Sequence, residues 1–236
     1  MKNLRYVSLI SIVAAVVFAV SFAASGSRQT PHLQKGISVQ MAATSNAAEM
    51  PQADDENAWI VTVTENGDLY FGVQPVTVDD LMEKMKATPR NRDQNLYIKA
   101  DARAPFANVM RVLRAGNEVW FQTPVLLTQQ RLPATSGAVI PPNGLQVLVG
   151  PTPPPGSVAT LVEMLNTQQG RPSLRVNGEE ISWSALGSIL RQHFQKGDDR
   201  IILLKAAERL PFGEVVQVID TCRATGAKVV LDTPGV

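Results

Sequence analysis

The chain contains an internal repeat, and this repeat constrains the possible folds more than any other feature. Residues 96–113 read LYIKADARAPFANVMRVL, and residues 202–219 read ILLKAAERLPFGEVVQVI. Aligning Pro105 with Pro211 also pairs Lys99 with Lys205, Ala100 with Ala206, Arg103 with Arg209, Phe106 with Phe212, Val109 with Val215 and Val112 with Val218. Self-similarity at a fixed separation predicts a structural unit that occurs twice.

The separation between matching positions stays nearly constant along the chain. It is 108 residues at Gly36, 105 at Val76 and 106 at Pro105. We therefore expect a first half, residues 36–128, and a second half, residues 144–236. Residues 129–143 between them lack a hydrophobic period and are rich in Pro, Gly and Ser, which is typical of a linker. Each half has enough apolar positions for a small two-layer α+β core.

Hydrophobic periods and turn residues predict the same order of elements in each half: strand, hairpin, helix, strand, helix, strand. In the first half these are a strand at 36–41, a loop at 42–57, a hairpin around Asn66-Gly67, a helix capped by Thr77 or Asp79, a strand at 96–100, a helix from Pro105 to Gly116 and a strand within 118–127. In the second half they are a strand at 144–149, a hairpin around Gly170, a helix capped by Ser182 or Ser184, a strand within 201–206, a helix at 211–223 and a strand at 228–232.

An apolar segment precedes the repeat. Lys2 and Arg5 are followed by an uncharged run from Tyr6 to Ala24. As a helix, the residues from Val7 to Ala24 span about 27 Å, close to the hydrocarbon thickness of a bilayer. The preceding basic residues predict that the rest of the chain is exported. We favour a membrane anchor at 1–24, with a polar tether at 25–35. The alternative is a cleaved signal peptide, because Ser21-Phe22-Ala23 resembles a processing site.

Composition excludes several classes of protein. The formal net charge is +1, and charged residues make up 18% of the chain. A chain that binds mainly nucleic acid would show a basic stripe, so no nucleic-acid partner is expected. Cys222 is the single cysteine, so no disulfide can form within the chain.

No motif for catalysis, cofactor binding or metal binding is visible. The two histidines, His32 and His193, have no cysteine or acidic neighbours at the spacing of a zinc site. The sequence has no phosphate-binding loop, no dinucleotide-binding glycine motif and no nucleophile elbow. We therefore expect a protein that is not an enzyme and has no cofactor.

The ordered features of the chain resemble the ExbD/TolR family of biopolymer transport proteins. These features are one N-terminal apolar segment, a glycine-led strand, an Asn-Gly hairpin ending near Val76-Thr77, and the pattern that runs from Ile98 to Gly116. Each half resembles one copy of the family's periplasmic domain. The resemblance implies α+β domains behind a membrane helix. It also implies an inner-membrane location with the C-terminal domains in the periplasm.

The resemblance also implies partners. Family members dimerise, pair with a multi-span subunit of the ExbB/TolQ type and use proton flow. A TonB- or TolA-like protein or peptidoglycan would then meet the periplasmic domains. The two halves of this chain are expected to form an internal pseudo-dimer, with a homodimer of whole chains as the alternative. In the family an aspartate in the membrane helix couples proton flow. No Asp or Glu occurs between Tyr6 and Ala24, so this chain alone is not expected to couple it.

Three residues are candidates for partner contacts. Asp101 matches a common family aspartate and could contact a partner, but an aspartate here more often fixes the turn before Pro105 through a local hydrogen bond. The second half has Ala207 there, so the fold does not require a carboxylate. Arg103 and Arg209 occupy matching positions and could meet acidic groups of the cell wall, although such residues are more often solvated loop ends.

A rival interpretation remains open. With its leader cleaved, the chain would be a secreted periplasmic protein whose domains bind the cell wall or another envelope protein.

Overall fold

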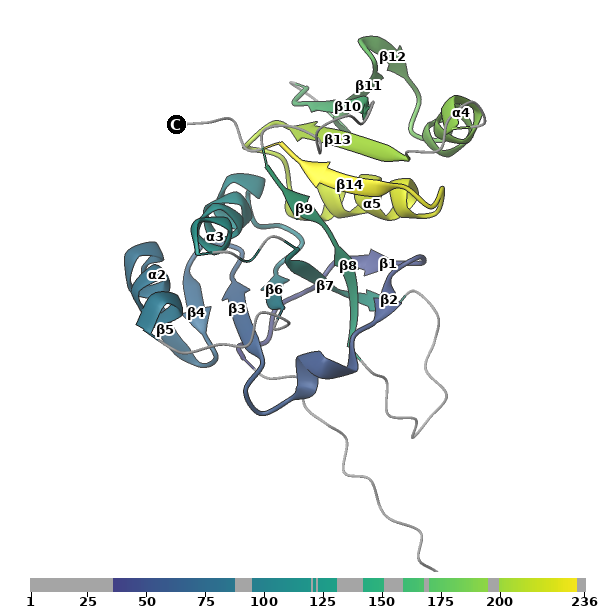
Figure 1. Cartoon of the computed structure of the whole chain (residues 1–236). Helices are drawn as coiled ribbons and strands as arrows, with labels where there is room; N and C mark the ends of the chain where they lie inside the picture. Colours follow the sequence, from purple (N-terminus) through teal and green to yellow (C-terminus); the bar gives the residue numbers. More distant parts are fainter. Residues whose placement is uncertain are drawn as a thin grey trace, which may run out of the picture. The chain divides into compact units, whose positions relative to one another are not determined.

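Two mixed β-sheets with helices packed on them make up the described part of the protein (Figure 1). The computed structural model describes residues 36–87, 95–119, 121, 123–130, 142–150, 159–167, 170–194 and 200–232, all within one compact unit. The expected anchor and tether, residues 1–35, and most of the expected linker, residues 131–141, lie outside the described residues. Among the helices that are described, none is long and apolar enough to cross a membrane.

The first half contains β3 (Trp59–Val63), β4 (Leu69–Phe71), β5 (Gln74–Val76), α2 (Val78–Ala87), β6 (Leu96–Ala100), α3 (Phe106–Glu118) and β7 (Val125–Gln130). Its strands are ordered β7-β6-β3-β4-β5. The strands β7, β6 and β3 are parallel, and β4 and β5 follow as antiparallel hairpins.

The second half repeats this arrangement. It contains β10 (Ala159–Leu165), β11 (Ser173–Val176), β12 (Glu179–Ile181), α4 (Leu186–His193), β13 (Ile201–Ala206), α5 (Phe212–Arg223) and β14 (Lys228–Leu231). The order β14-β13-β10-β11-β12 and every strand direction match the first half. The repeat in the sequence is therefore a repeat in topology.

Local sequence explains where the helices and turns fall. Pro105 and Pro211 precede α3 and α5 with φ of −56° and −58°, values that proline favours and that suit a helix start. Thr77 caps α2, since its Oγ1 accepts the Asp80 N–H at 3.1 Å while the Asp80 carboxylate accepts the Thr77 N–H at 3.1 Å. Gly67, with φ of +87°, makes the expected turn between β3 and β4.

The expected strand at 36–41 is wrong. This stretch has no ladder partner, and the first strand of the structure is β1 (Ala43–Thr44), parallel to β7. The reason is that the Gln40 backbone bonds to a turn instead. Its N–H donates to the Asp101 carboxylate at 3.1 Å, and its carbonyl accepts the Ala102 N–H at 2.8 Å. Residues 42–57, which were expected to form a loop, contain β1, β2 (Ala48–Glu49) and the 3-10 helix η1 (Pro51–Asp54).

The segment at 144–149 is extended, but it joins both sheets. Its first part, β8 (Asn143–Gln146), pairs antiparallel with β7 of the first half. Its second part, β9 (Leu148–Val149), pairs parallel with β14 of the second half. A Cβ at Gly144 would lie 2.4 Å from Val125 Cγ1, so glycine is required for this close approach. The first sheet therefore extends past the boundary expected from the repeat.

Helix ends differ slightly from expectation. Helix α3 continues past Gly116 to Glu118, and α4 begins at Leu186, so neither Ser182 nor Ser184 is its cap. The hydroxyls of Ser182 and Ser184 instead lie 3.1 Å from each other. These are shifts of a turn or less, which is the usual precision of boundaries inferred from sequence.

One apolar core runs through both halves. It includes Leu81, Ile98 and Phe106 from the first half, together with Leu204 and Phe212 from the second. A smaller cluster lies on the opposite face of the first sheet, where Met41 and Ala53 cover Ile60, Tyr97 and Val125. The segment before β3 therefore serves as a cover for that face.

Candidate interaction surfaces

The two halves meet along the turns that precede α3 and α5, residues 102–107 and 208–213, which we call the seam. Pro105 and Pro211 form an antiparallel bridge at its centre. Phe106 N–H donates to the Leu210 carbonyl and Phe212 N–H to the Ala104 carbonyl, both at 2.8 Å. Ala107 N–H likewise donates to Glu208 at 2.9 Å, and Gly213 N–H to Ala102 at 2.8 Å.

These four hydrogen bonds fall into two pairs related by the repeat. Exchanging each residue for its counterpart in the other half turns one bond of a pair into the other. This is the pattern of an isologous, two-fold interface, here formed within one chain. The structure thus brings the halves together as an internal pseudo-dimer requires.

Asp101 lies beside the seam and is 3% exposed. Its carboxylate accepts the Arg103 N–H at 3.0 Å, the Arg103 Nε–H at 2.9 Å and the Arg103 Nη2–H at 3.0 Å, besides the N–H of Gln40. The Arg103 side chain, followed by the N–H groups of Arg103 and Gln40, holds the pKa of this carboxyl below its ordinary value. Asp101 is therefore engaged locally, in the turn-fixing arrangement.

The two candidate arginines both reach the surface. The Arg103 side chain is 55% exposed and forms a second ion pair, from Nη1 to Glu65 Oε2 at 2.9 Å. Arg209 is exposed at the matching position of the second half.

The two lysines at matching positions of the halves differ in their surroundings. Lys99 is buried, which lowers the pKa of its ammonium group, whereas Lys205 is exposed and lies 3.4 Å from Asp232.

Cys222 is fully buried on the inner face of α5, and burial raises the pKa of its thiol to about 12. We predict that it stays unmodified by thiol reagents at pH 8 in the folded protein, because on the order of one thiol in 10,000 is then ionised. Labelling with and without denaturant, followed by mass spectrometry, measures this. Fast labelling of the folded chain would contradict the buried placement.

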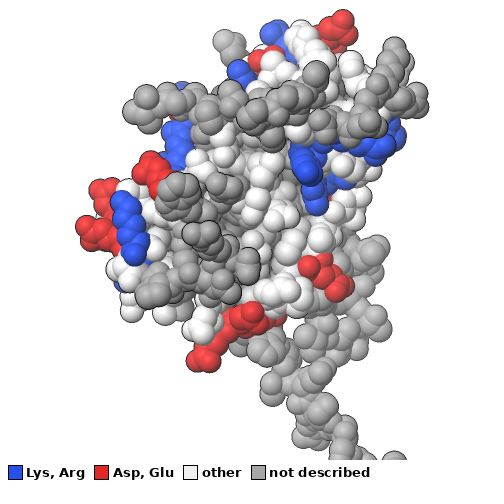
Figure 2. Space-filling model, viewed as in Figure 1, with Lys and Arg blue, Asp and Glu red and all other residues white. Residues whose placement is uncertain are grey.

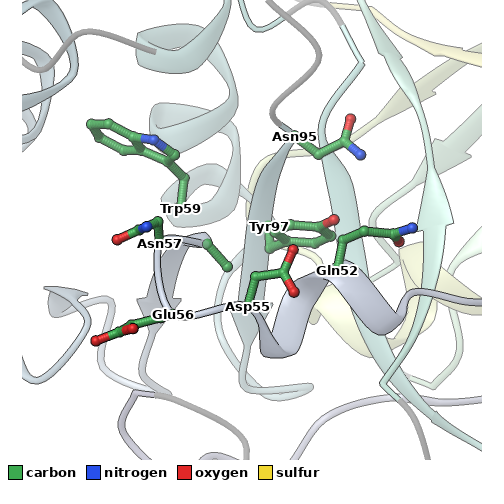
Figure 3. Close-up of a pocket in the computed structure, with 8 residues that line it drawn as sticks. Gln52, Asp55, Glu56, Asn57, Trp59, Asn95 and Tyr97 are labelled. Carbon is green, nitrogen blue, oxygen red and sulfur yellow. The ribbon is translucent and has the colours of Figure 1, made fainter. Parts of the chain in front are cut away.

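A pocket of about 540 Å³ opens where β3 and β6 begin (Figure 3). It is lined by Gln52, Asp55, Glu56, Asn57, Ala58, Trp59, Asn95 and Tyr97. Figure 3 shows the Asp55 carboxylate and the Tyr97 hydroxyl near the centre of the view, while the Glu56 and Asn57 side chains extend to the side. The described lining offers carboxylates, amides and aromatic rings, but no histidine, cysteine or serine that could act as a nucleophile.

Charges of both signs are spread over the surface seen in Figure 2, without a continuous basic stripe on that face. In the part of the chain that the structure describes, no cluster of three or more His, Cys, Asp or Glu residues is placed to hold a metal ion.

Asp220, which is not among the candidates predicted from the sequence, connects the two halves. This carboxylate of α5 is 7% exposed and accepts the N–H groups of Ser45 and Asn46 at 3.0 and 2.8 Å. A signal was present in the sequence. Asp220 is an acid among the apolar residues of α5, and its counterpart nine residues after the other proline is Arg114.

Among known proteins, the chain matches one family. The family model described as "Biopolymer transport protein ExbD/TolR" matches twice, at residues 2–131 and 128–234. No curated protein and no solved structure matches the chain significantly. Family members are transport accessory proteins, not enzymes, that work with subunits of the ExbB/TolQ type and are typically anchored in the inner membrane. The two matches together span nearly the whole sequence, so the chain belongs to the ExbD/TolR family and carries the family sequence in two tandem copies.

Proposed function

We propose that the chain is a non-enzymatic inner-membrane component of an ExbB/ExbD- or TolQ/TolR-type biopolymer transport complex. Residues 1–24 anchor it, and its two domains act in the periplasm as interaction modules. One chain then provides a ready-made pair of domains, where a relative with a single domain would need two chains.

The observation that carries this proposal is the seam. Equivalent turns of two family domains bind each other through two symmetry-related pairs of backbone hydrogen bonds, and one apolar core continues across them. Such pairing is what an isologous dimer of single domains would use. A pair fixed in this way presents two similar surfaces at a constant separation, which suits a structural arm in a larger assembly.

Partner contacts are proposed at one exposed arginine in each half. Arg103 and Arg209 are both exposed, and guanidinium groups bind carboxylates and phosphates in fixed geometry. Asp101 contributes by orienting Arg103. The proposed partners are a multi-span subunit in the membrane, and a TonB- or TolA-like protein or peptidoglycan in the periplasm.

The decisive experiment determines the N-terminus and the location of the mature protein. We expect an intact Met1, recovery in the membrane fraction, and co-purification with a co-produced ExbB- or TolQ-type subunit in detergent. A matched control lacking residues 1–24 behind a cleavable export signal should lose both. A mature chain that starts near Ala24 in the soluble fraction would instead establish the secreted binding protein.

We predict that replacing Ser8, Ser11 and Ser21 together with alanine leaves proton-dependent transport unchanged. These are the serines of the apolar run, which lies outside the described residues. Serine hydroxyls do not titrate near neutral pH, so any proton-carrying group must come from another subunit. Transport rates should be compared at equal membrane levels of the two proteins. A complete loss of transport, with the complex still assembled, would show that this segment takes part in the proton relay.

A further inference from the structure

The backbone hydrogen bonds of the seam are symmetric, but a side-chain contact beside the seam is not. Asp220 of the second half binds a turn of the first half: Oδ2 accepts the Ser45 N–H at 3.0 Å and Oδ1 accepts the Asn46 N–H at 2.8 Å. The Asn46 side-chain amide also donates to Asp220 Oδ2 at 3.2 Å and to the Asp220 carbonyl at 3.3 Å. The turn follows β1, which packs on α5 (Figure 1).

A pair made of two first halves would lack this contact. Arg114 stands in α3 where Asp220 stands in α5. A guanidinium group carries only donors, so it cannot accept the N–H groups of Ser45 and Asn46. Within the described residues the Arg114 Nε is buried without an acceptor, so the same position in the first half is already one donor in excess.

The close approach of Gly213 to Ala102 also disfavours two first halves. A Cβ added at Gly213 would lie 3.0 Å from Ala102 Cβ and 3.1 Å from the Ala102 carbonyl oxygen. The counterpart of Gly213 in the first half is Ala107. Two first halves would therefore place an Ala107 Cβ in a tight contact with Ala102 at both ends of the seam, and each contact would need a shift of a few tenths of an ångström.

A pair made of two second halves would lack the donors. Ser45 and Asn46 follow β1, and the residues that follow β9 in the second half are Gly150-Pro151-Thr152-Pro153-Pro154-Pro155. Proline has no backbone N–H. The first two of these residues therefore carry fewer backbone donors than Ser45-Asn46, and a buried Asp220 carboxylate without donors would be costly.

We infer that the seam is selective for unlike halves. The carboxylate of Asp220 accepts hydrogen bonds from the Ser45-Asn46 turn, and the absence of a side chain at Gly213 avoids a tight contact with Ala102. The chain therefore pairs its first half with a second half, either its own or one supplied by another chain, and does not build the seam from two like halves.

The test uses the full chain in detergent with a specific protease site placed within residues 131–141, between β7 and β8. The protein is cleaved, unfolded in urea, refolded by dilution and examined by native mass spectrometry. We expect pairs of one first and one second half, a result to which the pairing of β8 with β7 also contributes, so the variants below isolate the share of Asp220 and Gly213. Pairs of two first or two second halves, at amounts set by random mixing, would overturn the inference.

A gain of pairing provides a second arm. Arg114→Asp combined with Ala107→Gly gives the first half the two features that it lacks. After cleavage and refolding, this variant should yield pairs of first halves that the wild type does not yield. Failure to form them, with unlike pairs still present, would mean that Asp220 and Gly213 do not set the selectivity.

A third arm avoids unfolding. In the cleaved chain, Asp220→Asn should weaken association of the halves by about 10- to 100-fold, since it replaces one acceptor oxygen by a donor amide. Asn46→Ala should weaken it less, and the double variant by less than the product of the two effects. The matched control is Glu214→Gln on the same helix, whose partner Arg171 lies in its own half. Equal dissociation constants for Asp220→Asn and Glu214→Gln would refute the proposed contact.

Discussion

Replacing Phe212 with alanine is expected to lower the free energy of unfolding by about 3–5 kcal/mol, the usual cost of deleting a fully buried phenyl ring. The side chain of Phe212 is 0% exposed, and it belongs to the one core cluster that includes residues of both halves. The loss should therefore be felt in both halves. Urea denaturation measures the total effect, and Val73→Ala, at a side chain 70% exposed, is the matched control expected to change little.

Hydrogen exchange measured by mass spectrometry shows where the Phe212→Ala effect is felt. If the halves unfold together, amides of β6 and of β13 should lose the same amount of protection, although Phe212 lies in the second half. Loss of protection confined to β10–β14 would show that the halves are independent in stability. The shared core and the seam would then add little to the stability that each half has by itself.

The repeat explains why so much of the fold could be anticipated. Each half carries its own turn and helix signals, so the hairpin at Gly67 and the helices after Pro105 and Pro211 follow from local chemistry alone. A signal found twice at one spacing is also harder to produce by chance. The shared topology of the halves was thus the most secure expectation.

What could not be anticipated depends on contacts between distant residues. The alternation of Ile37, Val39 and Met41 is the same whether the stretch joins a ladder or lies across a sheet, so periodicity alone predicted a strand wrongly. The two pairings of the segment 143–149 depend on where β7 and β14 come to lie. No local signal in Gly144 or Leu148 states which sheet each will join.

The candidate residues also divide into those held by local contacts and those held by contacts between distant residues. The side chain of Asp101 was open to two interpretations, and the structure shows its local turn contacts. Asp220 was overlooked because a helical acid is usually solvated. Only comparison with Arg114 at the matching position marks it as a point where the halves have diverged. Differences between copies, rather than similarities, therefore indicate where a fused pair has become specific.

Asp101→Asn is expected to cost about 2–3 kcal/mol at neutral pH. Asparagine keeps one acceptor oxygen but places an amide N–H₂ against donors, because the carboxylate oxygens face N–H groups of Arg103 and Gln40. The matched control is Asp68→Asn, an exposed aspartate in the same half that should change stability by less than about 0.5 kcal/mol. Urea denaturation of the three proteins at pH 7 gives both values.

The pH dependence separates the charge of Asp101 from its shape. Because folding lowers the pKa of Asp101, its carboxylate stabilises the protein above the pKa of the unfolded chain, and this contribution is lost as pH falls through the folded pKa. The stability difference between wild type and Asp101→Asn should thus be constant from pH 7 to about pH 5 and shrink below about pH 4. A difference that stays constant down to pH 3 would mean that the carboxylate's charge does not hold the turn. The 36–41 segment would then be held by its packing on Ile60 and Tyr97 rather than by the hydrogen bond from Gln40.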